Sequence, residues 1–313
     1  MSVPQETIAS AVRTSMGGGY SPVVSHALSI PVLVGAVVAA CSAPAVPSAA
    51  ADAEPPAQSE PDGERMSQKL LSSVTAAAPG SSFTLALSCR VAKGWHTYWP
   101  GLNDTGAPAS IEFSLPAGWT AGEPQWPAPT RHVSPGDLVD YALEGDFTVL
   151  VEVQVPQDAA VGATHEVSVA AGWLVCKNVC VMESRTSTAT IRVEKAMVAS
   201  PDNAELIGAA RKKLPEATVP AGLELKVNGR EFSATWQGAS SMEFCPLDSA
   251  VSYENLLKDG ASDSATLRVK LGEFPNSARV EGVVVGVFGA DRKAVRRAVR
   301  VSLPVPGDEP EAK

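Results

Sequence analysis

Two cysteines close together in the sequence are the residues of this chain best suited to covalent chemistry. Three residues lie between Cys176 and Cys180 in Trp173-Leu174-Val175-Cys176-Lys177-Asn178-Val179-Cys180. Strand-like apolar residues precede this pair, and a second strand-like run begins near Thr186, which predicts a β-hairpin with the cysteines at or near its tip. A three-residue connection can place the flanking residues opposite each other, at a Cα separation that a disulfide accepts.

Such a pair can be redox-active, structural or part of a metal site. A cross-link over so short a loop stabilises a fold by only about 2 kcal/mol, against about 3 kcal/mol for a 15-residue loop. Two thiols held in a loop can interconvert with a disulfide without moving the fold, and Lys177 between them would favour a thiolate. Spacing alone favours the redox interpretation over a local structural disulfide. A metal site would need two more ligands, and none of His96, His132 and His165 has a characteristic spacing to the pair.

The other cysteines have different surroundings. Cys89 lies in an apolar strand pattern and Cys245 lies in Met242–Pro246, and we expect them in different domains. Each is predicted to be a buried free thiol, with a Cys89–Cys245 disulfide as the alternative. The sequence has no phosphate-binding glycine loop, Gly-x-Ser-x-Gly elbow or His-Glu-x-x-His motif, and neither a cofactor nor a metal is expected.

Composition limits the class of protein. The 313 residues carry a net charge of −9, which argues against nucleic acid as the main partner because a phosphate backbone requires a basic face. No apolar run approaches the ~20 residues of a membrane span, so a multi-span transporter is excluded. The 25 glycines and 25 prolines favour short strands joined by turns.

The N-terminal segment has the pattern of an export signal. Residues 27–40 form an apolar run that leads into Cys41, and Val38-Ala39-Ala40-Cys41 resembles a lipobox. We therefore predict that residues 1–41 are a signal peptide with a lipobox and that an acylated Cys41 anchors the protein to a membrane surface. The alternative is ordinary cleavage near Ala43-Pro44-Ala45, which would give a secreted soluble protein. Both alternatives place the chain in an oxidising compartment.

The remainder predicts an all-β protein with two domains. Residues 42–66 are poor in large apolar residues and are expected to be a disordered tether. Residues 67–199 are predicted to be a β-sandwich, residues 200–214 a helical linker capped by Asp202 or Asn203, and residues 215–306 a second, smaller β-sandwich. Residues 307–313 form a tail. The expected strands are Phe83–Leu87, Ile111–Leu115, Phe147–Val155, His165–Val175, Thr186–Val193, Leu223–Val227, Glu231–Trp236, Ala265–Leu271, Val280–Phe288 and Ala298–Leu303.

Several separated motifs in residues 67–193 resemble one family. They are Gly94-Trp95-His96-Thr97-Tyr98-Trp99, Asn103-Asp104-Thr105-Gly106, Gln125-Trp126-Pro127-Ala128-Pro129, Tyr141-Ala142-Leu143-Glu144-Gly145 and the segment from Trp173 to Cys180. In this order they resemble the periplasmic N-terminal domain of the DsbD/ScsB thiol:disulfide interchange proteins. The helix and the second β domain resemble the continuation in the ScsB-like branch, but more weakly.

The resemblance implies an immunoglobulin-like sandwich in the periplasm, in which Cys176 and Cys180 are the redox pair. A DsbD-like membrane electron transporter or a thioredoxin-like protein would reduce this pair, which would then reduce periplasmic disulfide-containing proteins. The aromatic residues implied to shield the pair are Tyr98, Trp99 and Tyr141, and Trp173 and Lys177 are expected to support it.

The chain departs from the family in two respects. Val181-Met182 stand where the family often has proline soon after the second cysteine. The 313 residues contain neither the transmembrane transporter nor the thioredoxin-like domain, so a separate protein is expected to supply the electrons. If the redox role has been lost, the alternative function is a non-catalytic β-sandwich binding module with a structural hairpin disulfide.

Overall fold

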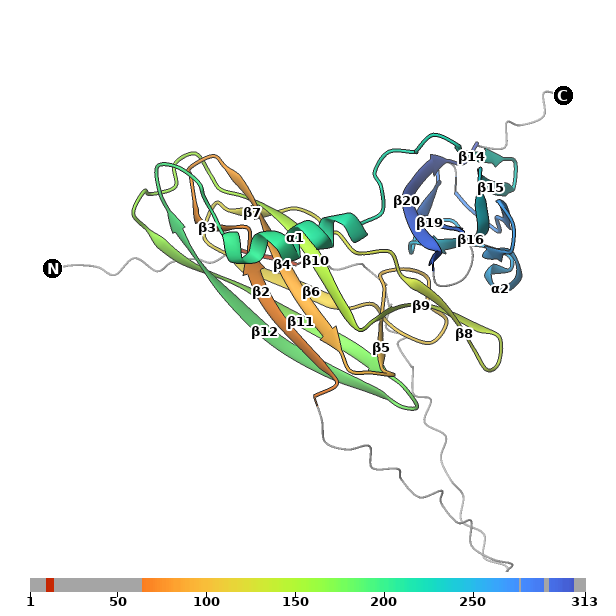
Figure 1. The fold of residues 1–313 in the computed structure, drawn as a ribbon, viewed down its shortest axis with the longest axis horizontal. Helices are drawn as coiled ribbons and strands as arrows, with labels where there is room; N and C mark the ends of the chain where they lie inside the picture. The colour runs from red at the N-terminus through yellow and green to blue at the C-terminus, as the bar shows by residue number, and fades with distance from the viewer. Residues whose placement is uncertain (1–9, 14–63, 276, 290–292, 307–313) are drawn as a thin grey trace, which may run out of the picture. The chain divides into compact units, whose positions relative to one another are not determined.

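The computed structural model of the protein describes residues 10–13, 64–275, 277–289 and 293–306 (Figure 1), all within one compact unit. The predicted lipidation site Cys41, the predicted tether up to residue 63 and the tail 307–313 lie outside the described residues. Within the predicted signal peptide, strand β1 (Ser10–Arg13) pairs antiparallel with β6 (Ser110–Leu115). No helix in the described ranges is long and apolar enough to span a membrane.

Two sheets form the first β module, which we define as residues 66–199. The larger sheet has the strand order β13-β3-β12-β11-β5-β9-β8, and β6 also pairs with β11; the smaller sheet has the order β2-β4-β10-β7. The remaining strand bounds are β2 Met66–Ser72, β3 Val74–Ala77, β4 Ser82–Val91, β5 His96–Tyr98, β7 Thr120–Ala121, β8 Thr130–Ser134, β9 Leu138–Glu144, β10 Asp146–Gln154, β11 Thr164–Cys176, β12 Cys180–Val193 and β13 Val198–Ala199.

Alternating burial explains how these strands form a sandwich. In β11, Val167, Val169, Trp173 and Val175 are completely buried, while the residues between them are more exposed, as expected for a strand with one core face. Side chains from both sheets make one hydrophobic core. The fold confirms the all-β prediction. Met66, the last residue of the predicted tether, begins β2, and its side chain is completely buried.

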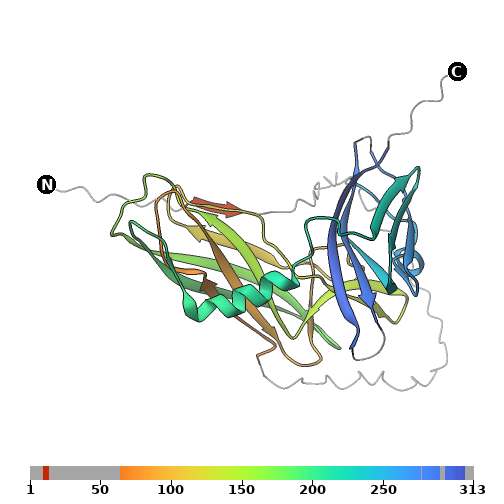
Figure 2. The same cartoon turned by 45° about the horizontal axis from the view of Figure 1, so that its top comes forward.

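Helix α1 (Pro201–Lys213) follows the first module and lies over the outer face of the smaller sheet (Figure 2). Ile207 and Ala210 pack there in a cluster with sheet residues. The expected capping by Asp202 or Asn203 is wrong. Ser200 is the N-cap, and Pro201 occupies the first turn, where its missing N–H costs no hydrogen bond.

The second β module, defined as residues 215–306, also pairs two sheets around its own core. The strand orders are β14-β15-β18 and β17-β16-β19-β20. The bounds are β14 Leu223–Asn228, β15 Glu231–Trp236, β16 Ala239–Pro246, α2 Leu256–Asp259, β17 Ala261–Ser262, β18 Thr266–Lys270, β19 Arg279–Phe288 and β20 Val295–Pro304. Strand β16 was not among the expected strands, yet it pairs along most of its length with β19.

Candidate redox site

Strands β11 and β12 form a hairpin that ends at the two cysteines. The antiparallel register runs from Thr164 opposite Arg192 to Cys176 opposite Cys180. The two cysteines form a disulfide with a Cα separation of 4.1 Å. The backbone N–H of Lys177 donates to the carbonyl of Val179 at 3.1 Å and closes the tip. The predicted hairpin is therefore confirmed, and it places both sulfur atoms at one end of the larger sheet.

The two cysteines differ sharply in exposure. Cys176 is only 2% exposed, whereas Cys180 is an exposed residue. Thiol–disulfide exchange requires a thiolate to reach one particular sulfur of the disulfide. In this arrangement Cys180 is the residue that solvent reaches, and Cys176 is enclosed.

A tyrosine hydroxyl contacts the buried sulfur. The hydroxyl of Tyr98, on β5, donates to Cys176 Sγ at 3.2 Å and lies 3.4 Å from Thr105 Oγ1. Thr105 donates its own hydroxyl hydrogen to Asp140 Oδ2 at 2.5 Å, and its backbone N–H donates to Asp140 Oδ1 at 3.0 Å. Since that hydroxyl hydrogen is committed to the carboxylate, the hydrogen of Tyr98 can point to the sulfur or to Thr105 Oγ1.

The environment keeps Tyr98 in its protonated form. Its side chain is buried, and burial raises the pKa of the phenol above its usual value, with a smaller contribution from the Asp140 charge. A protonated phenol can donate a hydrogen bond to a thiolate, and such charge-assisted bonds are stronger than neutral ones. The site can therefore stabilise negative charge on Cys176.

A segment that we name the covering loop, Trp99–Gly106, encloses Tyr98. The side chain of Asn103 donates to the carbonyls of Trp99 and Gly101 and accepts from the backbone N–H of Tyr141. Asp104 Oδ2 accepts from the N–H of Val139 at 2.7 Å, which ties the loop to β9. A Cβ atom on Gly106 would overlap the ring of Tyr98, so the loop backbone lies directly against that ring.

Two histidines and a glutamate lie beside the pair. His96 is opposite Cys176 on one side and Glu144 on the other. The rings of His96 and His132 are 5.5 Å apart, and His132 Nε2 lies 3.2 Å from Glu144 Oε1. Burial, and then the charge of His132, lower the pKa of His96, so this imidazole is neutral at pH 7.

Cationic side chains pack on Trp95 next to the hairpin tip. The ammonium of Lys177 lies 6.0 Å from the centroid of the indole ring, and the guanidinium of Arg65 lies 5.1 Å from it. Lys177 thus lies at the hairpin tip with its ammonium near Trp95. Its effect on the cysteine thiolates stays a prediction from the sequence.

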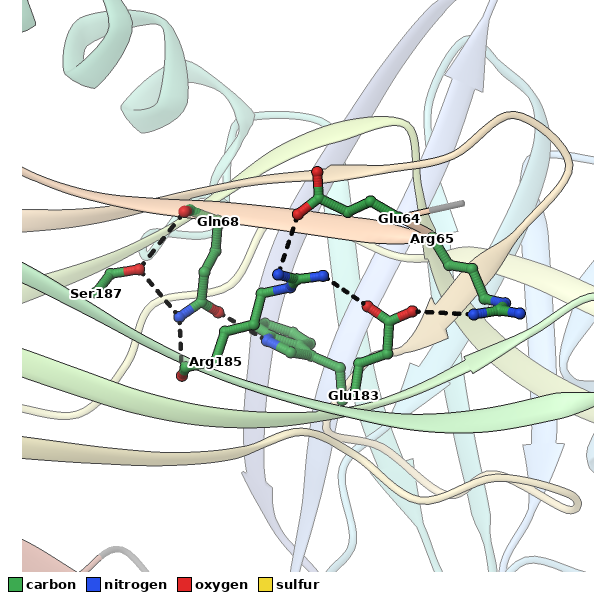
Figure 3. Close-up of polar contacts among 7 residues, drawn as sticks. Glu64, Arg65, Gln68, Glu183, Arg185 and Ser187 are labelled. Carbon is green, nitrogen blue, oxygen red and sulfur yellow. Dashed lines mark hydrogen bonds and ion pairs between the residues drawn. The ribbon is translucent and has the colours of Figure 1, made fainter. Parts of the chain in front are cut away.

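Figure 3 shows a polar network that joins β12 to residues 64–68. Glu183 Oε2 accepts from Arg185 at 3.2 Å and Glu183 Oε1 lies 3.7 Å from Arg65, while Glu64 lies 3.0 Å from Arg185. Gln68 on β2 donates to the carbonyl of Arg185 and accepts from the indole N–H of Trp173. The network holds β2 against β12, starting at Glu183, which is three residues beyond Cys180.

The structure separates the expected shielding residues into two groups. Tyr98 contacts Cys176 and Lys177 stands between the cysteines, whereas three aromatic residues lie in the hydrophobic core: Trp99, Tyr141 and Trp173. Thr105 and Asp140 were not singled out from the sequence. Thr105 belongs to the quoted motif Asn103–Gly106, but its residue type gives no indication of a contact with Asp140.

Cys89 and Cys245 are both free and buried, which confirms the prediction. Burial raises the pKa of both thiols, and desolvation is the largest cause for each. Both therefore stay protonated in the folded protein. Among the described residues, no group of three or more His, Cys, Asp or Glu side chains is placed to hold a metal ion.

A comparison of the sequence with known protein families finds a match that includes the hairpin. The family described as "Thiol:disulfide interchange protein DsbD, N-terminal" matches residues 67–191. These residues form a DsbD N-terminal domain. The match ends within β12 and contains the covering loop and both paired cysteines, so the site described above belongs to the DsbD N-terminal domain. No curated protein matches the chain.

Solved structures extend the likeness in fold beyond the DsbD N-terminal domain. The N-terminal periplasmic domain of ScsB from Proteus mirabilis is 13% identical, with a TM-score of 0.50, and the match covers 79% of this chain and 96% of that one. A protein of unknown function from Porphyromonas gingivalis W83 is 9% identical, with a TM-score of 0.23, and the match covers 77% and 100%. The first likeness shows a shared fold over both β modules.

Proposed function

We propose that this chain is an exported thiol:disulfide interchange module that relays electrons through Cys176 and Cys180. The observation that carries the proposal is the asymmetry of the pair. Cys180 is exposed at the tip of the hairpin, and Cys176 is buried with a hydrogen-bond donor, Tyr98, on its sulfur. An exchange module needs one sulfur that partners can reach and a second that leaves or attacks within the domain.

The proposed reaction balances as a two-electron transfer. In the reduced domain the Cys180 thiolate attacks a partner disulfide, forms a mixed disulfide and releases one partner thiolate. Cys176 loses its proton to solvent and attacks Cys180 Sγ, which restores the internal disulfide and releases the second partner thiolate. In the reverse direction a donor thiolate attacks Cys180 Sγ, and Cys176 leaves as a thiolate that accepts the Tyr98 hydrogen bond.

The proposed partners follow from the family. The electron donor is a DsbD-like membrane transporter or a thioredoxin-like protein, and the acceptors are periplasmic proteins with disulfides. The proposed location is the periplasm, with acylation of Cys41 as the means of holding the module at a membrane surface. Export by ordinary cleavage would leave the same exchange chemistry in a soluble protein.

The reduction potential of the Cys176–Cys180 couple tests the proposal directly. Purified protein is equilibrated in glutathione or dithiothreitol buffers, and the fraction of disulfide is measured after alkylation. We expect a potential between about −270 and −120 mV, the range of exchange proteins. A value below about −300 mV would indicate a structural disulfide and would support the non-catalytic binding module instead.

Single-cysteine variants test the assigned roles. With glutathione disulfide as the probe, Cys176→Ser is expected to accumulate a mixed disulfide on Cys180, because no internal thiol can resolve it. Cys180→Ser is expected to react much more slowly, because the remaining sulfur is buried. A Cys180→Ser protein that reduces a test disulfide at the wild-type rate would contradict the assignment.

A further inference from the structure

The covering loop contacts the second β module as well as the site. The backbone N–H of Leu102 donates to the carbonyl of Pro246, at the end of β16, at 3.1 Å. A Cβ atom built on Gly101 would lie 2.6 Å from that carbonyl oxygen and 2.6 Å from the ring of Trp99. Real Cβ atoms do not approach so closely, so only glycine allows the loop to pass between Trp99 and β16.

Further contacts hold the second module at this place. Cys245, beside Pro246, is completely buried and belongs to the same hydrophobic cluster as Trp99 and Tyr141. The guanidinium of Arg131, on β8, donates to the carbonyls of Leu256 and Leu257 at 3.0 and 2.8 Å. The first contact is apolar and packs β16 beside Trp99, whereas the second is polar and joins β8 to α2.

The covering loop is thus attached at both of its ends. Its far end is tied to β9 through Asp104 and Thr105 and rests on the ring of Tyr98, while its near end is tied to Pro246. An opening of the loop that exposed Cys176 would have to break one of these attachments. The attachment to Pro246 is the one that residues 215–306 contribute.

We propose that the second β module holds the covering loop closed over Tyr98 and Cys176, and so restricts reaction with outside thiols and oxidants to Cys180. This inference rests on the proposed exchange function and gives the second module a positioning role in it. Cys245 can then report separation of the second module from the covering loop, because a completely buried thiol at this contact reacts only when the two separate.

The test measures alkylation of the remaining thiols in the full chain carrying Cys180→Ser, kept reduced and treated with iodoacetamide. Peptide mass spectrometry follows Cys176, Cys245 and Cys89 separately. Adding Gly101→Ala is expected to raise the rates at Cys176 and Cys245 together by about fivefold or more, the effect of losing one hydrogen bond of about 1 kcal/mol. Cys89, buried in the core of the first module, is expected to keep its rate.

Gly208→Ala is the matched control, because a Cβ atom at this helical glycine meets nothing within 4 Å. It should leave all three rates unchanged. An unchanged rate at Cys176 in the Gly101→Ala protein would overturn the proposal, whether or not Cys245 becomes reactive.

A parallel rise at Cys89 would indicate general loss of the fold. In that case Arg131→Gln, which removes the two hydrogen bonds to Leu256 and Leu257, is judged by the rates at Cys176 and Cys245, and an unchanged rate at Cys176 again overturns the proposal. Because iodoacetamide reports access and not exchange, the result is independent of the reduction potential. A failure of this inference can therefore be distinguished from a failure of the proposed function.

Discussion

Replacing Tyr98 by phenylalanine should make the Cys176–Cys180 couple less oxidising. The change removes one hydroxyl and keeps the ring that lies under the covering loop. In the oxidised protein this hydroxyl donates to a neutral sulfur at 3.2 Å, a bond worth about 0.5–1.5 kcal/mol. In the reduced protein the same donor can meet a thiolate, and a hydrogen bond to a charged group is worth about 1.5–3 kcal/mol.

The hydrogen bond to the thiolate is therefore stronger than the bond to the disulfide sulfur by about 1–1.5 kcal/mol, and this extra energy stabilises only the reduced form with an ionised Cys176. For a two-electron couple 1.4 kcal/mol corresponds to about 30 mV. Tyr98→Phe should therefore shift the potential by about 20–30 mV to more negative values at pH 9, where the thiolate is populated. It should also raise the pKa of the Cys176 thiol by about one unit. At pH 6, where an unperturbed thiol with a pKa of about 8.5 is protonated, the shift should be smaller.

The assay is equilibration with dithiothreitol at both pH values, with the thiols counted after alkylation. Tyr141→Phe is the matched control, since the hydroxyl of Tyr141 is buried and donates no hydrogen bond to either paired cysteine. The reasoning would be refuted by a potential of Tyr98→Phe that stays within about 5 mV of wild type at pH 9. An equal shift in the Tyr141→Phe protein would refute it as well.

Three further predictions concern the frame around the pair. Glu183→Gln leaves two arginines without their shared carboxylate and should lower the free energy of unfolding in urea by about 1–3 kcal/mol. The control Arg192→Gln, at an exposed ion pair, should change it by less than about 0.5 kcal/mol, and equal effects of the two variants would contradict the role of the network. Gly106→Ala should cost about 1–3 kcal/mol in the same assay by displacing the ring of Tyr98, and a neutral result would mean that the loop does not press on it. Burial, and then the neighbouring His132, lower the pKa of His96 below the unfolded value of 6.5. The unfolded chain therefore binds this proton more readily, and the free energy of unfolding falls as the pH drops below about 6.5. His96→Gln should flatten that fall, and an unaltered profile of stability against pH would contradict the assignment.

The hairpin and its disulfide could be predicted because they are local. Three residues separate Cys176 from Cys180, and strand-like residues flank them, so a turn alone brings the two together. The alternation of apolar and polar residues likewise predicts strands such as β11 and β15. Strand β16 was missed because Ala-Ser-Ser-Met-Glu-Phe-Cys-Pro has no clear alternation and ends in proline, which is unfavourable inside a sheet.

The environment of the buried sulfur could not be predicted in the same way. Thr105 and Asp140 are 35 residues apart and meet only because β9 pairs with β5 behind the covering loop. Their residue types are common on surfaces, and no periodicity marks them. The contact between Leu102 and Pro246 is a backbone hydrogen bond, to which the side chains give no signal. Such contacts depend on which distant strands and loops lie side by side in the fold, and no local pattern in a single sequence shows that.

The short span of the hairpin disulfide also bears on how the chain acquires its cysteine pairing. The sequence separation of the pair is 4 residues, whereas Cys245 lies 65 residues beyond Cys180 and Cys89 lies 87 residues before Cys176. The probability of closing a loop falls with about the 3/2 power of its length, so the unfolded chain encounters the native pair about 60-fold more often than the Cys180–Cys245 pair. Oxidation can thus select the correct partners before either β module has folded. Folding then buries the thiols of Cys89 and Cys245, so neither of these two can exchange into the Cys176–Cys180 pair during the proposed cycles of oxidation and reduction.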